Sequence, residues 1–316
     1  MNTRTRLLHR LADGEWHTGP SLAGALGISR AAVAKAVNAL DAMGLPVERG
    51  RQGYCVPARL QPPRADQLAK SLPAAARERL LGLQTLYRVD STNSWLLRRS
   101  SEEDAAGSHV CIAAKQTAGR GRLGRAWDSP PGAGLYLSIS HSHAGAPASA
   151  MPLAVASQIA DAVESVVPGV QLRLKWPNDL LLDGAKVGGI LMESRGEYGG
   201  QWQVVIGLGL NLEGPAEDGR TSLAAAGFPA TGHGALAAAL LSRLLPGIPA
   251  AAADPRAWLE QWRARDFYRG RTVRVRGPRI DETGVAAGIE DDGALLLDTP
   301  VGRVQVTGGD VSLRET

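Results

Sequence analysis

The pattern of apolar and polar positions predicts three short helices and a hairpin in the first sixty residues. Leucines at helical spacing favour a helix over residues 4–12. Ser21 and Ser29 each stand before an apolar run, which predicts two further helices that they cap, the second reaching Leu40. Residues 45–56 then contain two short strands with arginines at their turn. These elements in this order are typical of a winged helix-turn-helix module.

The central region alternates predicted strands with predicted helices. The strands are expected at residues 86–89, 110–114, 135–139, 172–176, 180–182, 186–193 and 202–212, and the helices at 149–167, 235–245 and 255–265. Alternation at 110–114 and 135–139 predicts that both strands are half buried. Asp183 and Gly184 lie between two apolar runs and predict a hairpin turn.

The two ends of this region differ from it in composition. Residues 60–81 carry three prolines and are expected to form a linker with helical pieces. Beyond Asp266, short alternating strands predict a small all-β barrel, with strands at residues 272–275, 284–289, 294–297 and 302–306. The chain is therefore expected to be an α+β protein with domains at 1–62, 63–267 and 268–316.

A loop rich in arginine and glycine connects two predicted central strands. Residues 119–125 read GRGRLGR and hold three residues of each type. Glycine lets backbone N–H groups approach a ligand closely, and the guanidinium group donates paired hydrogen bonds to carboxylate or phosphate. Between Asp104 and Asp161 the only acidic residue is Asp128, so the stretch is kept positive. The expected ligand is an anion.

The same loop matches G-x-G-x-x-G, the fingerprint of dinucleotide binding. That interpretation requires a helix starting at the glycines and an acidic residue about 20 positions later. Residues 128–132 read DSPPG, which stops a helix, and residues 129–160 hold no Asp or Glu, so dinucleotide binding is disfavoured. A solvated basic hairpin is the other alternative, but surface loops usually mix both signs of charge.

Composition favours a soluble protein with one basic module. All of the formal net charge of +4 falls within residues 1–60, where eight Lys and Arg stand against four Asp and Glu. A localised basic excess is typical of a polyanion-binding module. Cys55 and Cys111 are expected to be reduced, and His141 and His143 to be structural. No run reaches the ~18 apolar residues of a membrane span and no secretory core is evident, so the chain is expected in the cytoplasm.

Three motifs resemble those of the biotin–protein ligases. They are GRGRLGRAW at 119–127, KWPND at 175–179 and KVGGIL at 186–191. With its helix-turn-helix module, the chain resembles the bifunctional ligases that also repress the biotin operon. The resemblance covers essentially the whole chain. It implies a mixed-sheet core like that of class II aminoacyl-tRNA synthetases and a C-terminal SH3-like barrel.

The resemblance also implies an activity and its partners. Biotin and ATP, with Mg²⁺, would form biotinoyl-5′-AMP, and biotin would then pass to a lysine of the biotin carboxyl carrier protein of acetyl-CoA carboxylase. Operator DNA would be the second partner, and the chain would form a homodimer when the adenylate is bound. Because its loop holds three glycines, we expect the loop to be mobile without ligand and to close over the adenylate.

Three residues are expected to carry the chemistry. Arg122 and Lys186, together with Arg120 and with Mg²⁺ on the phosphates, would offset the repulsion between the biotin carboxylate and the ATP phosphate. Family analogy implies that Arg122 holds the phosphate and that Lys186 bridges the carboxylate and the phosphate. Asp179 is the candidate that orients the acceptor lysine and takes its proton, with a plain turn residue as the alternative. No protein side chain is assigned to a metal.

Further residues are expected to contact biotin or the adenylate. Trp127 is expected on the adenine side or in loop packing. Gly207 and Gly209 lie on one face of a strand, where they leave room for a flat ligand ring or for another backbone. The full set is Ser91, Thr92, Asn93, Gln116, Gly119, Arg120, Gly121, Arg122, Arg125, Trp127, Lys186, Gly189, Gly207, Gly209 and Asn211. Asp90 and Ser91 are in addition typical helix caps.

The N-terminal module offers six candidate DNA contacts, namely Ser29, Arg30, Lys35, Asn38, Arg49 and Arg51. A protein-interaction module of the same shape is the alternative, and the localised charge favours DNA. For the whole chain the alternatives are a lipoate-type ligase, a ligand-sensing transcription factor without ligase chemistry, and a ligase whose DNA-binding domain is vestigial or used differently.

Overall fold

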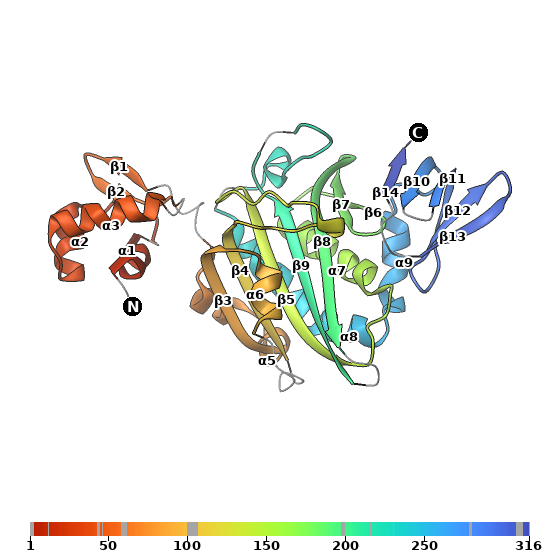
Figure 1. Ribbon diagram of the computed structural model, residues 1–316, viewed down its shortest axis with the longest axis horizontal. Helices are drawn as coiled ribbons and strands as arrows, with labels where there is room; N and C mark the ends of the chain where they lie inside the picture. Colours follow the sequence, from red (N-terminus) through yellow and green to blue (C-terminus); the bar gives the residue numbers. More distant parts are fainter. Residues whose placement is uncertain are drawn as a thin grey trace. The chain divides into compact units, whose positions relative to one another are not determined.

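The computed structural model separates into two compact units, residues 1–62 and 63–316. Figure 1 labels their elements along the chain. Two expected boundaries lie outside the described residues. They are the last residue of the first helix, 12, and the first residue of the linker, 60. The structure describes residues 3–11, 13–42, 45, 47–57, 62–99, 107–196, 200–214, 216–229, 231–277, 280–307 and 312–315.

The first unit is a small helical domain with a two-stranded hairpin, as the sequence predicts. Leu22, Val33 and Val37 are buried between the helices because they recur on one face of each. Backbone bonds between His17 and Tyr54 tie the hairpin to the segment before the second helix. The elements are α1 (Thr3–Leu11), α2 (Gly19–Leu26), α3 (Arg30–Ala42), β1 (Glu48–Gly50) and β2 (Gly53–Cys55).

The N-cap of α2 differs from the prediction. Thr18, not Ser21, caps this helix, and its hydroxyl oxygen accepts a hydrogen bond from the backbone N–H of Ser21 at 3.2 Å. Pro20 fits the first turn, where no N–H is needed, so the helix starts earlier than expected. Ser29 does accept a bond from the backbone N–H of Ala32, at 3.1 Å, as expected for the cap of α3.

The second unit is built on a seven-stranded mixed sheet in the order β3-β4-β5-β9-β8-β7-β6. Only β3 and β4 pair in parallel, and the other neighbours are antiparallel. The turn at Asp183 and Gly184 joins β7 to β8 as predicted, with both residues at positive φ. The strands are β3 (Leu80–Val89), β4 (Ser108–Gln116), β5 (Gly134–Ala144), β6 (Arg173–Lys175), β7 (Asp179–Leu182), β8 (Ala185–Gly196) and β9 (Gln201–Asn211).

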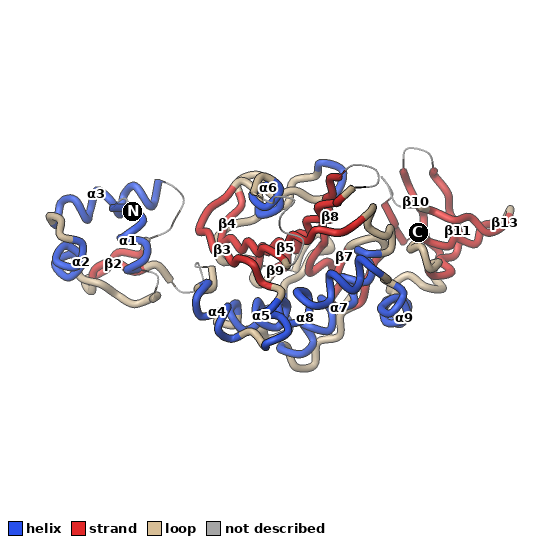
Figure 2. Tube along the Cα trace, turned by 90° about the horizontal axis from the view of Figure 1, so that it is seen from below, coloured by secondary structure: helices blue, strands red, loops and turns tan. Residues whose placement is uncertain are grey.

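Helices cover both faces of this sheet. Figure 2 shows α4, α5, α7 and α8 along one face and α6 on the other. Val110 and Ile112 face the larger helical layer, whereas Cys111 packs with Leu96 of α6. The expectation that the strands at 110–114 and 135–139 are half buried is therefore wrong, because helices pack on both sides of the sheet and bury both faces of these strands. The helices are α4 (Ala65–Ser71), α5 (Ala74–Glu78), α6 (Thr92–Leu97), α7 (Met151–Val166), α8 (His233–Ala253) and α9 (Arg256–Arg265).

The proline-containing segment before the sheet belongs to the core rather than to a linker. Leu68, Leu72 and Ala76 are buried against the helical layer. Strand β3 begins at Leu80, six residues before the prediction, since pairing with β4 extends it. Helix α8 is also longer than predicted. By length and composition alone, α8 is the one helix of the described residues that passes as a membrane-spanning candidate, and half of the apolar stretch concerned is buried inside the protein.

The C-terminal strands form a five-stranded antiparallel sheet in the order β13-β12-β11-β10-β14. The last strand was not predicted. The Trp176 indole N–H donates to the carbonyl of Gly293 at 2.9 Å and so joins this sheet to the central domain. The strands are β10 (Thr272–Gly277), β11 (Ile280–Ile289), β12 (Leu295–Thr299), β13 (Gly302–Val306) and β14 (Ser312–Glu315).

The two cysteines and His141 have buried side chains. Cys55 and Cys111 are buried and free. His141 and His143 lie on β5 with their rings 6.3 Å apart. Burial lowers the pKa of His141 to about 4, so this ring is neutral at pH 7. Among the described residues no three His, Cys, Asp or Glu side chains gather as a metal site would require.

Candidate functional site

A cavity of about 980 Å³ opens on the α6 side of the central sheet. Its walls come from the loop of residues 119–125, here called the arginine loop, from the start of α6, and from the strands β7, β8 and β9. Every residue predicted to contact biotin or the adenylate lines it, apart from Gly119, and so does Asp179. Gly119 is buried instead, and a Cβ atom there would lie 2.5 Å from the carbonyl oxygen of Trp127. Its role is therefore to let the loop fold back tightly on itself.

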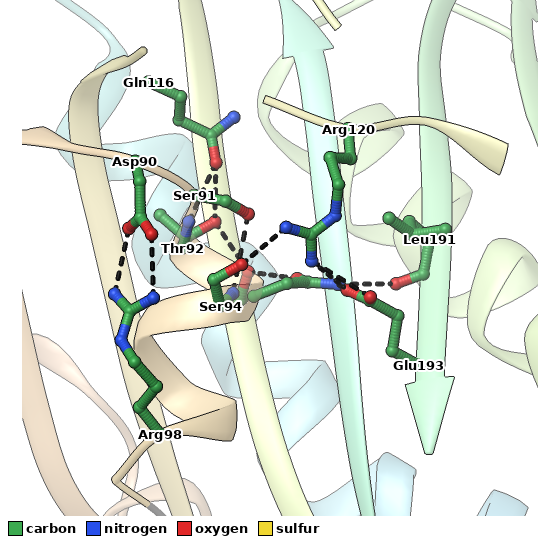
Figure 3. A network of polar contacts seen from close by, with 11 residues as sticks. Asp90, Ser91, Thr92, Ser94, Arg98, Gln116, Arg120, Leu191 and Glu193 are labelled. Atoms are coloured by element: carbon green, nitrogen blue, oxygen red, sulfur yellow. Dashed lines mark hydrogen bonds and ion pairs between the residues drawn. The ribbon is translucent and has the colours of Figure 1, made fainter. Parts of the chain in front are cut away.

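The start of α6 contributes buried polar groups. Ser91 accepts a bond from the backbone N–H of Ser94 and caps the helix as expected. Asp90 does not cap it. Its carboxylate pairs with Arg98 at 2.7 and 2.9 Å, and the hydrogen bonds from Arg98 lower the pKa of Asp90 to about 2. Asp90 thus ties the helix to the strand before it (Figure 3).

Asn93 is 3 % exposed, and both the NH₂ group and the oxygen of its amide have protein partners. Its NH₂ group donates to the carbonyl of Leu191 at 3.2 Å and to Glu193 at 2.8 Å, and its Oδ1 accepts from Ser138 at 2.6 Å. A Cβ atom at Gly207 would lie 2.2 Å from that Oδ1. The glycine is needed because Asn93 lies directly over the strand.

A chain of polar contacts continues from Asn93 toward the arginine loop. Gln116 Oε1 accepts hydrogen bonds from the backbone N–H of Thr92 at 2.9 Å and from its hydroxyl at 3.1 Å. The Gln116 amide N–H then donates to Ser129 at 3.1 Å. Ser138 lies 2.7 Å from the Thr92 hydroxyl and completes the chain. These side chains are held in place before any ligand binds.

Arg120 is paired rather than left open to solvent. Its guanidinium donates to both oxygens of Glu193 at 3.0 Å and to the Ser94 hydroxyl at 2.5 Å. Figure 3 shows Glu193 reaching from β8 to this arginine. The charge of Arg120 is thus already balanced in the protein, which the sequence did not suggest.

Lys186 and Asp179 meet on the other side of the cavity. The Lys186 ammonium lies 2.5 Å from Asp179 Oδ1 and 5.3 Å from the centre of the Trp127 ring. Lys175 lies 3.8 Å from the other oxygen of Asp179. The carboxylate therefore serves two ammonium groups, and both lysines lie on strands paired with its own, Lys175 on β6 and Lys186 on β8.

Trp127 packs over the glycines of two neighbouring strands. A Cβ atom at Gly209 would lie 2.5 Å from its ring, and one at Gly189 would lie 3.3 Å from it. The atoms nearest to Gly207 and Gly209 thus belong to side chains, and the expectation that another backbone packs on them is wrong. The indole N–H of Trp127 is buried and has no hydrogen-bond partner among the described residues.

The tip of the arginine loop is a tight turn. The N–H of Gly121 donates to the carbonyl of Arg125 at 2.8 Å, and Leu123 and Gly124 have φ of 65° and 70°. Arg125 is exposed and Arg122 is partly exposed. A non-glycine residue at positive φ is uncommon, so the loop holds Leu123 in an unfavourable backbone conformation.

The segment that follows β9 supports Lys186 from outside the sheet. Lys186 donates its backbone N–H to the carbonyl of Gly219 at 2.8 Å and accepts one from Thr221 at 2.9 Å. Asn211 donates its amide to the carbonyl of Thr221 at 3.0 Å. Asn211 thus lines the cavity and also holds the segment that positions the backbone of Lys186.

The six candidate DNA contacts of the first unit differ in whether their side chains are already bonded to other protein groups. Arg30, Lys35 and Arg51 are exposed. Arg49 forms an ion pair with Asp41 and donates to the side chain of Asn38 at 3.0 Å, so two of the candidates are bonded to each other. Ser29 is used as a helix cap.

The polar residues absent from the expected set share one feature. Glu193, Ser138 and Ser94 act on residues far from them in sequence, and none stands in a recognisable motif. Lys175 belongs to the KWPND motif but had no expected role. The sequence did hold one signal for Glu193. It lies on the predicted strand 186–193, two residues after the KVGGIL motif.

Family models match three segments of the chain. Residues 85–211 match the model described as "Biotin/lipoate A/B protein ligase family", and residues 269–314 match "Biotin protein ligase C terminal domain". Residues 3–55 match "HTH domain".

Relatives and solved structures give the same result. The chain is 35 % identical over 318 residues to the bifunctional ligase/repressor BirA of Escherichia coli, with 98 % of this chain and 96 % of that protein covered. It is 34 % identical over 269 residues to the biotin–[acetyl-CoA-carboxylase] ligase of Mycobacterium tuberculosis, covering 80 % and 97 %. The Aquifex aeolicus biotin protein ligase in complex with biotin and ATP matches with a TM-score of 0.63 and 26 % identity, covering 75 % and 100 %. This chain therefore belongs to the biotin–protein ligase family, among the bifunctional ligase/repressors that carry a helix-turn-helix domain.

Proposed function

We propose that the chain is an ATP-dependent biotin–protein ligase that forms biotinoyl-5′-AMP and transfers biotin to a lysine of a carboxylase carrier domain. The observation that carries the proposal is that one cavity brings three groups of side chains together. They are the hydrogen-bonding groups at the start of α6, the arginine loop, and the ion pair of Lys186 with Asp179. A small ligand with few polar atoms and an anionic end suits these walls.

In the first step the biotin carboxylate attacks the α-phosphate of ATP. Two like charges about 4 Å apart repel by roughly 4 kcal/mol at an effective dielectric near 20. This would slow the step by about a thousandfold. Arg120, Arg122 and Lys186 line the cavity, so they are the cations proposed to offset this repulsion. Lys186 would exchange Asp179 for the reacting oxygens.

Mg²⁺ is proposed as part of the ATP substrate. Magnesium bound to nucleotides takes most of its ligands from phosphate oxygens and water, so it needs few protein groups. The carboxylates Asp128, Glu217 and Asp218 line the cavity and fit that limited role. The roles proposed for Arg122, Lys186 and Asp179 do not depend on the ion.

In the second step an acceptor lysine attacks the adenylate. A free lysine with pKa near 10.4 is neutral in only one of about 2,500 molecules at pH 7. Asp179 lies at the cavity and is 18 % exposed, so it is the proposed residue that orients the amine and receives its proton. When Lys186 leaves Asp179 in the first step, one carboxylate oxygen of Asp179 would become available to accept the proton of the amine.

Labelled biotin, ATP, Mg²⁺ and an isolated carrier domain test the ligase directly. We expect pyrophosphate release with biotin and ATP alone, and label on the carrier lysine when the domain is added. Lipoate should not replace biotin. Transfer of lipoate but not biotin would favour a lipoate-type ligase, and the absence of pyrophosphate release would favour a sensor without ligase chemistry.

The first unit supports a second proposed role as a biotinoyl-AMP-responsive repressor. Arg30 and Lys35 are exposed on α3, the second helix of the helix-turn-helix, and Arg51 is exposed at the hairpin turn. Such helices enter the major groove of DNA, and dimers read two half-sites. We therefore propose that the chain dimerises with adenylate bound, binds operator DNA, and acts in the cytoplasm.

Sedimentation and gel shifts on the upstream DNA of its own gene and of biotin synthesis genes test this role. Biotin with ATP should raise both the dimer fraction and the affinity for one of these DNA fragments. Ligase activity with no shift on any fragment would indicate that the helix-turn-helix domain is vestigial or has a different use.

A further inference from the structure

Glu193 connects three parts of the central domain that are far apart in sequence. From β8 it accepts two bonds from Arg120, 73 positions away on the arginine loop, and one from Asn93, 100 positions away on α6. Its side chain is 30 % exposed and that of Arg120 is 37 % exposed. Isolated ion pairs at this exposure contribute little, but a carboxylate that accepts bonds from two different elements orders both of them.

Glu193 lies outside the cavity wall. Arg120 and Asn93 line the cavity, whereas Glu193 and Ser94 do not. The carboxylate therefore holds the arginine from outside the cavity wall and uses only part of its five N–H groups, since three contacts are made with Glu193 and Ser94.

A carboxylate also determines which way the Asn93 amide points. Ionised Glu193 can only accept hydrogen bonds, so the NH₂ group of Asn93 must face it. Oδ1 must then face Ser138, whose single hydroxyl proton is directed to it at 2.6 Å. Ser138 in turn neighbours Thr92, which is bonded to Gln116. One acceptor at residue 193 thus fixes the orientation of the Asn93 amide and of the Ser138 hydroxyl bonded to it.

We propose that Glu193 is a positioning residue for biotin, acting through Arg120 and Asn93 without touching the ligand. This inference rests on the proposed ligase function. It predicts that loss of the acceptor-only carboxylate weakens biotin binding far more than ATP binding, because the groups that it orients lie on the α6 side of the cavity, away from Lys186.

The Glu193→Gln variant tests this inference, because it keeps the shape of the side chain but removes the charge and adds a donor. We expect the KM for biotin to rise about tenfold or more, in line with the loss of charge-assisted hydrogen bonds, while the KM for ATP changes less than about twofold. Glu282→Gln, at an exposed position on β11, is the matched control and should leave both values unchanged.

A double-mutant cycle separates positioning from a general structural effect. In an Arg120→Ala background, Glu193→Gln should raise the KM for biotin less than it does alone, since one of the two groups it holds is already gone. Equal effects in both backgrounds, a parallel rise in the KM for ATP, or values matching Glu282→Gln would overturn the inference. If the unmodified protein forms no adenylate, the proposed function fails instead, so the two failures are distinguishable.

Discussion

The two sides of the cavity hold their cations in different ways. Arg120 is anchored by Glu193, which lies outside the cavity wall, whereas Lys186 is anchored by Asp179, which lies in the wall and also serves Lys175. A cation held from behind can stay paired while it contacts a ligand. A cation whose partner faces the ligand must exchange that partner when the ligand arrives. The first arrangement suits recognition, and the second suits chemistry in which charge moves.

Replacing Lys186 tests the exchangeable side and should have the largest effect. Lys186→Ala removes the ammonium that would meet the carboxylate and phosphate, so we expect adenylate formation to fall by about a thousandfold or more. Pyrophosphate release measures this, with the urea unfolding midpoint as a check of the fold. Lys70→Ala, at an exposed position on α4, is the control. Normal adenylate formation by Lys186→Ala would remove the assigned role.

Arg122→Gly should show the next largest effect. Arg122 lies on the loop that would close over the adenylate, so its loss should let biotinoyl-AMP escape about a hundredfold faster, as the loss of charge-assisted bonds predicts. Rapid filtration of the enzyme with labelled adenylate measures the off-rate, and random labelling of added albumin reports the leak. An unchanged off-rate would place the adenylate elsewhere.

Asp179→Asn should slow the transfer step by about tenfold to a hundredfold, the range given by a general base. The measurement starts from preformed adenylate and follows label on the carrier domain. Hydroxylamine, an amine that is neutral at pH 7, provides the control, because it needs no base and should react equally with both proteins. Equal slowing with hydroxylamine would mean that Asp179 acts by holding Lys175 and Lys186 instead.

The first unit also contains one arginine that is bonded to protein groups and one that is exposed. Replacing the exposed one is expected to have the smallest effect of the four predictions. Arg51 is exposed at the hairpin turn, while Arg49 is bonded to Asp41 and Asn38. Arg51→Ala should weaken DNA binding severalfold and reduce the salt dependence by about one counterion. Arg49→Ala should change the salt dependence less. Fluorescence anisotropy over a salt series compares them, and equal slopes would show that Arg49 leaves its ion pair on binding DNA.

Local signals in the sequence account for much of the fold. The turn at Asp183 and Gly184, the cap at Ser29 and the strand pair flanking the arginine loop each depend on neighbours within a few residues. The residues expected to contact biotin or the adenylate, apart from Gly119, also line the cavity, since strands that are adjacent in the sheet bring loops at their ends together.

Non-local contacts decided the rest. Leu68 and Ala76 pack into the core although their segment reads as a linker, and helices on both sides of the sheet bury both faces of β4 and β5. Glu193 meets its partners across 73 and 100 positions. The sequence by itself thus pointed to residues that line the cavity. Only the tertiary structure decided which counter-ion each cation receives, because a side chain's partner across a sheet depends on strand order and register, which no local pattern specifies.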